Sequence, residues 1–343
     1  MYKIGIIGAT GYTGSELVRL LHHHTEVNIE LITSETYAGQ QFSDIHPQFK
    51  GLVDFKLESA SAVSEADLDL VFLALPHGVS MEYVKKLYEK DVKIVDLSGD
   101  FRLDSKESYE KWYNKSHIFA EGFKKAVFGL PELNRAKIEN ARLIANPGCF
   151  PTGAILSIVP LLKEGLINGD HIFVDSKTGV TGAGIKAKDV THFPNVNDNF
   201  KAYGLKTHRH TIEIQESVNR YAGQNATIQF TPHLLPIDRG ILTSVYAIPE
   251  QKVTEAGLRK LYKKYYDNEP FIRLKESSPE LKNVRGTNLV DICPAYDERT
   301  NNILVFAAID NLVKGAAGQA IQNMNIMLGL PERSSLDIIP LQP

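Results

Sequence analysis

The sequence predicts an α/β protein: an N-terminal parallel sheet covered by helices, followed by an α+β domain with a mixed sheet. Three observations carry this prediction. Residues 3–24 read as an apolar strand, a glycine-rich turn and an amphipathic helix. Short apolar strands then alternate with helical segments, as in parallel sheets buried on both faces. Beyond residue 164 the apolar segments are richer in β-branched residues and their connections are longer, which favours a mixed or antiparallel sheet.

The elements follow in order from hydrophobic periodicity and from turn residues. In the first part we predict strands at 3–7, 28–33, 70–75, 92–97 and 142–145, and helices at 15–24, 81–89 and 150–164. In the second part we predict strands at 171–176, 226–231, 241–248, 289–293 and 303–309, a helix at 211–220, and one extended loop at 270–282. A closing helix at 312–328 stops at Gly329, carries its small and apolar residues on one stripe and could return to the first domain. The predicted domains are residues 1–147, 148–310 and 311–343.

Composition narrows the possible functions. The chain has 343 residues with 38 basic and 41 acidic side chains, so its net charge of -3 gives no reason to expect a nucleic-acid or membrane partner. Only two cysteines occur, which implies no disulfide framework and favours a reducing compartment. We see no secretion signal and no apolar run of about 20 residues. We therefore expect a cytoplasmic protein that acts on small molecules.

The first candidate site is the turn Gly8-Ala-Thr-Gly11-Tyr-Thr-Gly14, between the first strand and the first helix. Backbone N–H groups and the helix dipole at such a turn can hold a pyrophosphate, which predicts dinucleotide binding. Because the spacing is not the standard Gly-x-Gly-x-x-Gly, the alternative is that these glycines serve only close packing.

Residues at the end of the second predicted strand do not decide between NADP and NAD. Thr33 and Ser34 could hydrogen-bond the additional phosphate of NADP, whereas Glu35 could bind the ribose hydroxyls of NAD.

The two cysteines occupy different predicted environments. Cys149 follows a strand, a proline and a glycine and stands at the start of a helix, where unpaired N–H groups favour a thiolate. The alternative is that it is only a small apolar residue at a helix start. Cys293 lies inside an apolar strand segment, so we expect it to be buried and inert.

Histidines occur in two groups. His208 and His210, two residues apart before the helix at 211–220, could face one cavity, and an imidazole base beside a cysteine is a workable catalytic pair. Their alternative is a solvated surface cluster. The adjacent histidines 22–24, at a helix end, are expected to be favourable C-terminal charges rather than metal ligands, so no metal site is predicted.

Two further segments could meet a ligand. Arg102 lies just past the carboxyl end of a strand, where open α/β sheets bind ligands, and its planar fork suits a phosphate or carboxylate. An ordinary surface arginine is the alternative. The glycine-punctuated basic segment 177–188 could approach a ligand closely or could merely turn.

Together these motifs resemble one known family over essentially the whole chain: N-acetyl-gamma-glutamyl-phosphate reductase, a relative of aspartate-semialdehyde dehydrogenase. The motifs are Gly8-Ala-Thr-Gly11-Tyr-Thr-Gly14, Leu75-Pro76-His77-Gly78, Asp96-Leu-Ser98-Gly-Asp100-Phe-Arg102, Phe128-Gly-Leu-Pro131-Glu132, Asn146-Pro-Gly-Cys149, Thr181-Gly-Ala-Gly184, His208-Arg-His210 and Arg239-Gly240. The resemblance implies a Rossmann-like dinucleotide-binding domain at 1–147, a catalytic and oligomerisation domain at 148–310, and a C-terminal helix returning to the first. It also implies a homodimer or homotetramer.

The resemblance further implies reduction of N-acetylglutamyl 5-phosphate by NADPH to the semialdehyde and phosphate, as in arginine biosynthesis. It makes Cys149 the nucleophile and His210 the acid/base candidate, and it assigns substrate binding to Arg102, His208 and Asn146. The cofactor residues it implies are Gly8, Thr10, Gly11, Tyr12, Thr13, Gly14, Ser34, Pro76, Ser98, Gly182 and Asn311. Two positions depart from the family pattern: Ile212 replaces a usual proline, and Glu35 stands where an arginine often helps with the 2′-phosphate.

The chemistry is consistent with these roles. A thiolate that attacks an acyl phosphate expels phosphate and leaves a thioester, which is a carbonyl activated for hydride delivery. Backbone N–H groups at the start of the Cys149 helix could stabilise the oxyanion. Two alternatives stay open: a reductase of another acyl phosphate, such as aspartyl or aminoadipyl phosphate, and a nucleotide-binding redox sensor that kept the fold without catalysis.

Overall fold

The first of two compact units holds a six-stranded, fully parallel sheet. The computed structural model describes residues 1–342, and this unit comprises residues 1–147 and 316–337. Its strands are β1 (Tyr2–Ile7), β2 (Val27–Thr33), β3 (Leu70–Leu73), β4 (Lys93–Asp96), β5 (Ala126–Phe128) and β6 (Leu143–Ala145), in the spatial order β2-β1-β3-β4-β6-β5. β3 is buried at all four residues, as expected for a strand covered on both faces.

The helices of this unit are α1 (Tyr12–Leu21), α2 (Phe42–Ile45), α3 (Ser80–Tyr88), α4 (Lys106–Tyr113), α5 (Gly122–Lys125), α6 (Pro131–Glu139) and α11 (Gly318–Met327), with 3-10 turns at Pro47–Phe49 and Ala60–Ser64. Of these, α1, α3 and α6 pack against strands of the sheet. α11 packs against both α1 and α6 and also touches β4. All ten residues of α11 are buried, so its polar side is covered as well as its apolar stripe. Neighbours on several sides bury the whole circumference of α11.

The second unit, described over residues 148–315 and 338–342, is built on a seven-stranded mixed sheet. Its strands are β7 (Ile167–Thr178), β8 (Lys201–Ala202), β9 (Ile228–Leu234), β10 (Ile241–Pro249), β11 (Ile272–Leu274), β12 (Val290–Asp297) and β13 (Asn302–Ile309), in the order β11-β12-β13-β10-β7-β9-β8. The pairs β11–β12 and β7–β9 are parallel, and the remaining pairs are antiparallel.

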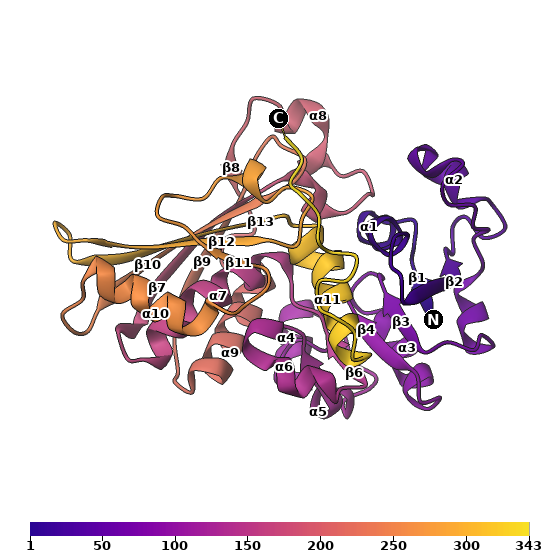
Figure 1. The fold of residues 1–343 in the computed structure, drawn as a ribbon, viewed down its shortest axis with the longest axis horizontal. Helices are drawn as coiled ribbons and strands as arrows, with labels where there is room; N and C mark the ends of the chain where they lie inside the picture. Colours follow the sequence, from indigo (N-terminus) through magenta and orange to yellow (C-terminus); the bar gives the residue numbers. More distant parts are fainter. Residues whose placement is uncertain (343) are drawn as a thin grey trace. The chain divides into compact units, whose positions relative to one another are not determined.

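Three long helices, α7 (Cys149–Lys163), α9 (His210–Ala222) and α10 (Glu255–Tyr266), lie along one face of this sheet (Figure 1). The unit also contains α8 (Phe193–Val196) and 3-10 turns at Val180–Ala183, Asp189–Thr191 and Leu281–Asn283. Alternation along β10 separates the two faces: Val245 is buried, whereas Tyr246 and Ile248 are 38% and 46% exposed. A π-helical turn, Val313–Ala317, leads into α11.

The predicted fold class is confirmed, with corrections to some of its elements. α1 begins at Tyr12, earlier than predicted, because Gly11 serves as the N-cap. Segment 270–282 is not an extended loop, since it contains β11, which pairs with β12. The residue boundaries predicted for the domains stay a prediction. Within the described residues, no helix is long and apolar enough to cross a membrane.

Candidate active site

The glycine turn joins β1 to α1. Gly8 has φ +87°, and a Cβ there would lie 2.5 Å from the Ala74 carbonyl oxygen, so only glycine fits. A Cβ at Gly14 would lie 2.3 Å from the Gly8 oxygen, which means that the helix start packs directly on the turn. Gly11 has more room, with its nearest neighbour at 3.8 Å, and no side chain caps α1. Packing therefore explains Gly8 and Gly14, while the uncapped helix start can also accept an anion.

Around this turn the polar side chains form a small network. The hydroxyls of Thr10 and Ser34 lie 3.0 Å apart, and the Thr10 carbonyl lies 3.1 Å from Nε2 of His46. Oε1 of Glu35 accepts the Ala60 N–H at 3.0 Å. One carboxylate oxygen of Glu35 is therefore engaged by the chain itself. The two other predicted cofactor residues of the turn, Tyr12 and Thr13, are exposed and half-buried respectively.

The loop after β4 carries Ser98 and Arg102. Ser98 is buried, and its hydroxyl donates to Asp96 and accepts the Asp100 N–H, so it holds the loop in shape. Arg102 is only 5% exposed and donates from Nη2 to the Leu97 carbonyl at 2.7 Å. Arg102 is thus a buried, oriented guanidinium, and the alternative of an ordinary surface arginine was wrong.

Asp100 ties this loop to the loop after β3, where the exposed Pro76 lies. Its fully buried carboxylate accepts the N–H groups of Gly78 and Met81 and the hydroxyl of Tyr109. Burial and the charge of Asp100 raise the pKa of the neighbouring Asp96 to about 7. These two aspartates therefore organise the strand ends and are not exposed to solvent.

Cys149 is the first residue of α7, with Gly148 as the N-cap. The Gly148 N–H donates to Oε1 of Glu213 at 2.7 Å. A Cβ at Gly315 would lie 2.8 Å from the Cβ of Cys149, so glycine there lets the backbone pass directly against the thiol residue. Cys149 is half-buried, so part of its side chain remains accessible. Burial inside β12 raises the pKa of the Cys293 thiol.

The two predicted histidines lie together beside Phe150, the residue after Cys149. The rings of His208 and His210 are 4.9 Å apart, and both stand edge-on to Phe150, at 5.5 and 5.7 Å. His210 is the first residue of α9 rather than a loop residue. Nδ1 of His208 accepts the His210 N–H at 3.2 Å. Burial, with a smaller effect of Arg209, lowers the pKa of His208 to about 4, so its imidazole is neutral at neutral pH.

Sequence reasoning missed two residues of this cluster. Glu213 is fully buried in the first turn of α9, and its Oε2 lies 3.9 Å from Nε2 of His210. Its sequence signal was the spacing, because residues three apart share a helix face. The Tyr203 ring lies 5.5 Å from that of His208, and burial, then the nearby Cys149 sulfur, raise the pKa of its hydroxyl. Tyr203 carried no comparable signal, since it lies in an irregular segment.

Two predicted residues of the second unit lie close together. Asn311 is 2% exposed, accepts the Gly240 N–H at 2.8 Å and donates to the Thr181 hydroxyl at 2.9 Å. Gly182 is exposed, and a Cβ there would meet nothing nearer than 3.7 Å. The Asn311 side chain therefore fixes the segment that presents Gly182.

Asn146, predicted to bind substrate, is fully buried. Its Nδ2 donates to the Ala316 carbonyl and its Oδ1 accepts from Asn323. The Asn146 amide is thus hydrogen-bonded at both ends inside the first unit.

The described residues hold no group of three or more side chains suited to a metal ion. Among the histidines at the end of α1, His24 is buried and its Nε2 lies 3.0 Å from Oδ1 of Asn325. All three histidines were expected to be favourable charges at the helix end, and His24 lies buried there. It joins the end of α1 to α11.

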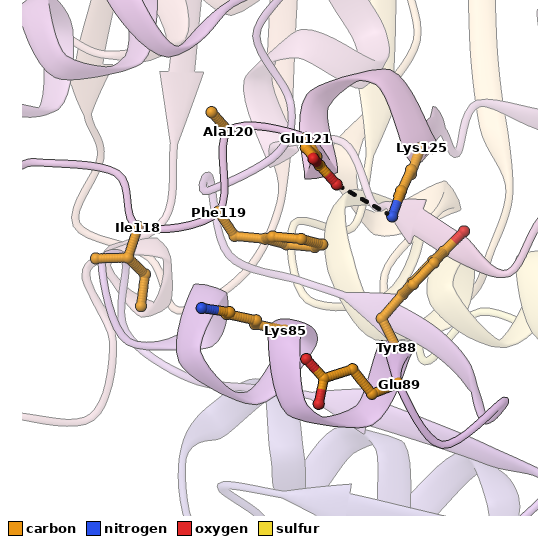
Figure 2. A pocket seen from close by; sticks show the side chains of 8 residues that line it. All are labelled: Lys85, Tyr88, Glu89, Ile118, Phe119, Ala120, Glu121 and Lys125. Carbon is orange, nitrogen blue, oxygen red and sulfur yellow. Dashed lines mark ion pairs between the residues drawn. The ribbon is translucent and has the colours of Figure 1, made fainter.

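A separate hollow of about 410 Å³ lies in the first unit, beside α3 and α5 (Figure 2). Its lining includes Tyr88, Phe119 and charged side chains, of which Lys125 and Glu121 pair at 3.5 Å. Lys125 also lies 4.6 Å above the Tyr88 ring. None of the predicted site residues lines this hollow, so we do not assign the chemistry to it.

Comparison with known proteins places this geometry in a family. A model described as semialdehyde dehydrogenase, NAD binding domain, matches residues 3–141, and the corresponding dimerisation domain matches residues 149–311. N-acetyl-gamma-glutamyl-phosphate reductases from Methanocaldococcus jannaschii and Halothermothrix orenii are 48% and 47% identical, with 100% of each chain covered. The chain belongs to the N-acetyl-gamma-glutamyl-phosphate reductase family.

Solved structures agree on the fold of this family member. Aspartate semialdehyde dehydrogenase II complexed with ASA from Vibrio cholerae superposes with a TM-score of 0.72 at 16% identity, covering 96% of this chain and 98% of that one. The Candida albicans enzyme with NADP gives a TM-score of 0.71 at 15% identity, with the same coverage. The family assignment confirms the resemblance stated from the motifs, and the nicotinamide-dinucleotide-binding domain is the one predicted from the glycine turn.

Proposed function

We propose that this protein reduces N-acetyl-L-glutamyl 5-phosphate to N-acetyl-L-glutamate 5-semialdehyde, with NADPH as reductant and release of phosphate. The observation that carries the proposal is the cluster of Cys149, His210 and Glu213 at the facing ends of α7 and α9. The full-length relatives that bear the reductase name support the choice of substrate. Arginine biosynthesis is the setting for this reaction.

In the proposed reaction the Cys149 sulfur attacks the acyl carbon, the bond from that carbon to the phosphate oxygen breaks, and inorganic phosphate leaves. His210 takes the thiol proton before attack and returns a proton as the semialdehyde forms. N–H groups in the first turn of α7 hold the oxyanion of the tetrahedral intermediate. When bound, the nicotinamide supplies the hydride that reduces the thioester.

The remaining roles are proposed by position. Arg102 holds the phosphate or carboxylate of the substrate, because it is buried and oriented. His208 meets the substrate as a neutral imidazole. Asn146 acts by fixing the turn that precedes Cys149, since its amide is fully buried.

The residues present fit a dinucleotide. The start of α1 has no side-chain cap, and Gly11 leaves space for a ligand to approach the backbone. Gly8, Thr10, Tyr12, Thr13, Gly14, Pro76, Ser98, Gly182 and Asn311 are the other proposed cofactor residues, by direct contact or by shaping the loops that make contact.

We propose a preference for NADPH over NADH. Ser34, hydrogen-bonded to Thr10, offers a hydroxyl to the 2′-phosphate, and one Glu35 carboxylate oxygen accepts the Ala60 N–H. Equal kcat/KM for the two cofactors would contradict this preference.

We also propose that the protein is a homodimer or homotetramer working in the cytoplasm. The sheet face opposite α7 exposes Phe173, Tyr246 and Ile248 by 38–48%, and Phe173 and Tyr246 are direct cross-strand partners. The same face carries the ion pair of Lys177 with Asp175, at 2.6 Å, and exposed apolar side chains beside such polar groups favour a protein partner. The matched dimerisation domain makes a second copy the natural choice. Sedimentation of the protein and of Tyr246→Lys tests this, because a charge on the face should dissociate the subunits.

One assay tests the reaction and its rival substrates. The enzyme is given NADP⁺, inorganic phosphate and, in turn, the semialdehydes of N-acetylglutamate, aspartate and aminoadipate. We expect phosphate-dependent reduction of NADP⁺ with the first and kcat/KM at least about tenfold lower with the others, the size of effect that one altered contact produces. Faster turnover of another semialdehyde would establish the other acyl-phosphate reductase, and no turnover with any would favour the non-catalytic redox sensor.

A further inference from the structure

His46 lies against the glycine turn between β1 and α1. Its Nε2 is 3.1 Å from the carbonyl oxygen of Thr10, the third residue of that turn. A carbonyl can only accept a hydrogen bond, so Nε2 carries the proton and donates it. The His46 side chain is buried, and burial lowers its pKa, so the ring is neutral at neutral pH. The contact is therefore a hydrogen bond from a neutral imidazole to the backbone of the turn.

The segment around His46 holds the ring in place. The ring packs against those of Phe42 and Phe49, with centroids 5.0 and 6.3 Å away, and both phenylalanines are buried. The His46 N–H donates to the Phe42 carbonyl, and the His46 carbonyl accepts the Phe49 N–H. The Phe42 N–H donates to the Phe55 carbonyl, which closes the segment on itself. The position of His46 is thus set by its own segment and not by the turn that it contacts.

Thr10 is the residue of the turn that receives this support. Its hydroxyl lies 3.0 Å from that of Ser34, so Ser34 holds the side chain while His46 holds the carbonyl. The next residue is Gly11, where a Cβ would meet nothing nearer than 3.8 Å. A glycine in open space offers little steric resistance to rotation of the peptide that joins it to Thr10. The His46 hydrogen bond therefore decides in which direction the Thr10 carbonyl points.

The direction of this carbonyl matters to a bound anion. α1 has no side-chain cap, and its first backbone hydrogen bond runs from the Ser15 N–H to the Gly11 carbonyl. The N–H groups of residues 12–14 therefore remain for a ligand. A pyrophosphate there is attracted by these N–H groups and repelled by a carbonyl oxygen that turns toward it. The Thr10 carbonyl cannot rotate toward the helix start without losing its bond to His46.

We propose that His46 is a positioning residue of the dinucleotide site: it holds the Thr10 carbonyl away from the pyrophosphate and keeps the turn in the conformation that accepts this anion. The inference rests on the proposed function, because its ligand is the proposed cofactor. It assigns His46 to the pyrophosphate, which NADPH and NADH share, and not to the 2′-phosphate. The competing explanation is that His46 only stabilises the fold of its own segment.

His46→Leu and His46→Gln separate the two explanations. Leucine keeps an apolar side chain against Phe42 and Phe49 but cannot donate to Thr10. Glutamine is long enough for its amide nitrogen to take the place of Nε2, so it restores the hydrogen bond. In fluorescence titrations we expect His46→Leu to raise the Kd of NADPH and of NADH alike, by about fivefold to tenfold, the effect of one hydrogen bond. His46→Gln should stay within about twofold of the wild type.

Steady-state kinetics give a readout that a purely structural role would not move. His46→Leu should raise the KM for both cofactors, while kcat at saturating cofactor and the KM for the acyl phosphate stay unchanged. Ser34→Ala, by contrast, should raise the KM for NADPH more than that for NADH, because Ser34 is proposed to meet the 2′-phosphate. A loss in His46→Leu that was confined to NADPH would assign His46 to the 2′-phosphate and overturn the proposal.

His24→Leu is the matched control. His24 is also a buried histidine of the first unit, and its Nε2 lies 3.0 Å from Oδ1 of Asn325, beyond the other end of α1. We expect both leucine variants to lower the free energy of unfolding in urea without nucleotide. Only His46→Leu should change the two Kd values. An equal rise of both values in His24→Leu would show that the loss follows from destabilisation alone, and would overturn the proposal.

One measurement does not depend on a folded variant. In a crystal structure of the wild type with NADPH, we expect the Thr10 carbonyl to keep its bond to His46 while N–H groups of residues 12–14 bind the pyrophosphate. A Thr10 carbonyl that left His46 when the nucleotide was bound would contradict the positioning role.

Two titration results would also leave only a structural role: Kd values in His46→Leu equal to those of the wild type, or a loss in His46→Gln as large as in His46→Leu. Failure of the proposed function would look different. In that case no semialdehyde would be turned over, whereas NADPH and NADH would still bind in a manner that depends on His46.

Discussion

The thiols of Cys149 and Cys293 lie in two different environments within the second unit. Cys149 stands half-buried at the first residue of α7, a helix start without a side-chain cap, where the N–H groups of the first turn have no partner within the helix. Cys293 is 4% exposed in the middle of β12, where the strand's N–H groups belong to the sheet ladder and burial raises the pKa of its thiol.

The difference lies in what each backbone offers to a charge. A helix start presents unpaired donors and a favourable dipole, whereas at Cys293 in the strand interior desolvation outweighs the opposing effect of the Arg259 charge. Local secondary structure thus makes the Cys149 sulfur suited to thiolate chemistry and the Cys293 sulfur suited to packing.

The largest effect should come from Cys149→Ser. Incubation of the wild type with the acyl phosphate and no NADPH should trap a thioester on Cys149, because acylation requires only the nucleophile and a leaving phosphate. The variant should lose both adduct and turnover while it still binds the cofactor, since a serine hydroxyl has no comparable tendency to ionise. Mass spectrometry measures the thioester adduct, and a fluorescence titration with NADPH measures cofactor binding. Substantial reductase activity in a folded variant would remove covalent catalysis from the proposal.

His210→Asn should produce the next largest loss. We expect kcat to fall by about 100-fold to 10,000-fold, with substrate binding little affected, because the variant lacks the proton shuttle. His208→Asn is the natural comparison, since burial keeps the His208 imidazole neutral. If His208→Asn abolished turnover while His210→Asn kept it, the two roles would have to be exchanged.

The sequence predicted the parts of the site that local structure creates. The strand–turn–helix at Gly8–Gly14 and the helix start at Cys149 follow from short-range patterns, and both are present. The spacing of Glu213 from His210 was a local signal, but its contact with Gly148 depends on the packing of α9 against α7, which the local sequence does not encode.

Tertiary context also adds what short sequence patterns do not show. The burial of Asn146 and of Arg102, and the carbonyl and amide partners that orient them, are visible only in the folded chain. β11 escaped prediction because a three-residue strand has too few residues to show a period.

Selective alkylation compares the two thiols directly. At pH 7 we expect iodoacetamide to modify Cys149 at least about tenfold faster than Cys293, because the helix start favours the Cys149 thiolate. An ordinary thiol with a pKa of about 8.5 is mostly protonated at pH 7, and burial protects Cys293 further. Peptide mapping after timed quenching gives both rates from one sample. Equal rates would show that the helix start confers no special reactivity on Cys149.

Arg102→Lys should weaken substrate binding without disturbing either cysteine. A point charge cannot reproduce the planar fork that Arg102 presents, so KM for the acyl phosphate should rise by roughly tenfold, the size of one charge-assisted hydrogen bond. Iodoacetamide rates at Cys149 and Cys293 should remain as in the wild type. An unchanged KM would show that Arg102 serves only the loop that it bonds to through Leu97.

Cys293→Ala should have the smallest effect on function and a measurable one on stability. We expect unchanged kcat and KM, and a loss of about 1–2 kcal/mol in the free energy of unfolding at pH 7, because removal of the buried sulfur leaves a small cavity.

The difference in unfolding free energy between wild type and Cys293→Ala should shrink as the pH rises. Since burial raises the pKa of the Cys293 thiol in the folded protein, only the unfolded chain ionises readily as the pH rises past about 8.5. The thiol's stabilising contribution is complete below that pH and declines above it, so wild type and variant should converge between pH 7 and pH 10. Urea unfolding of both proteins at the two pH values measures this convergence, and a gap that widened with pH would mean that the folded protein favours a thiolate at Cys293 after all.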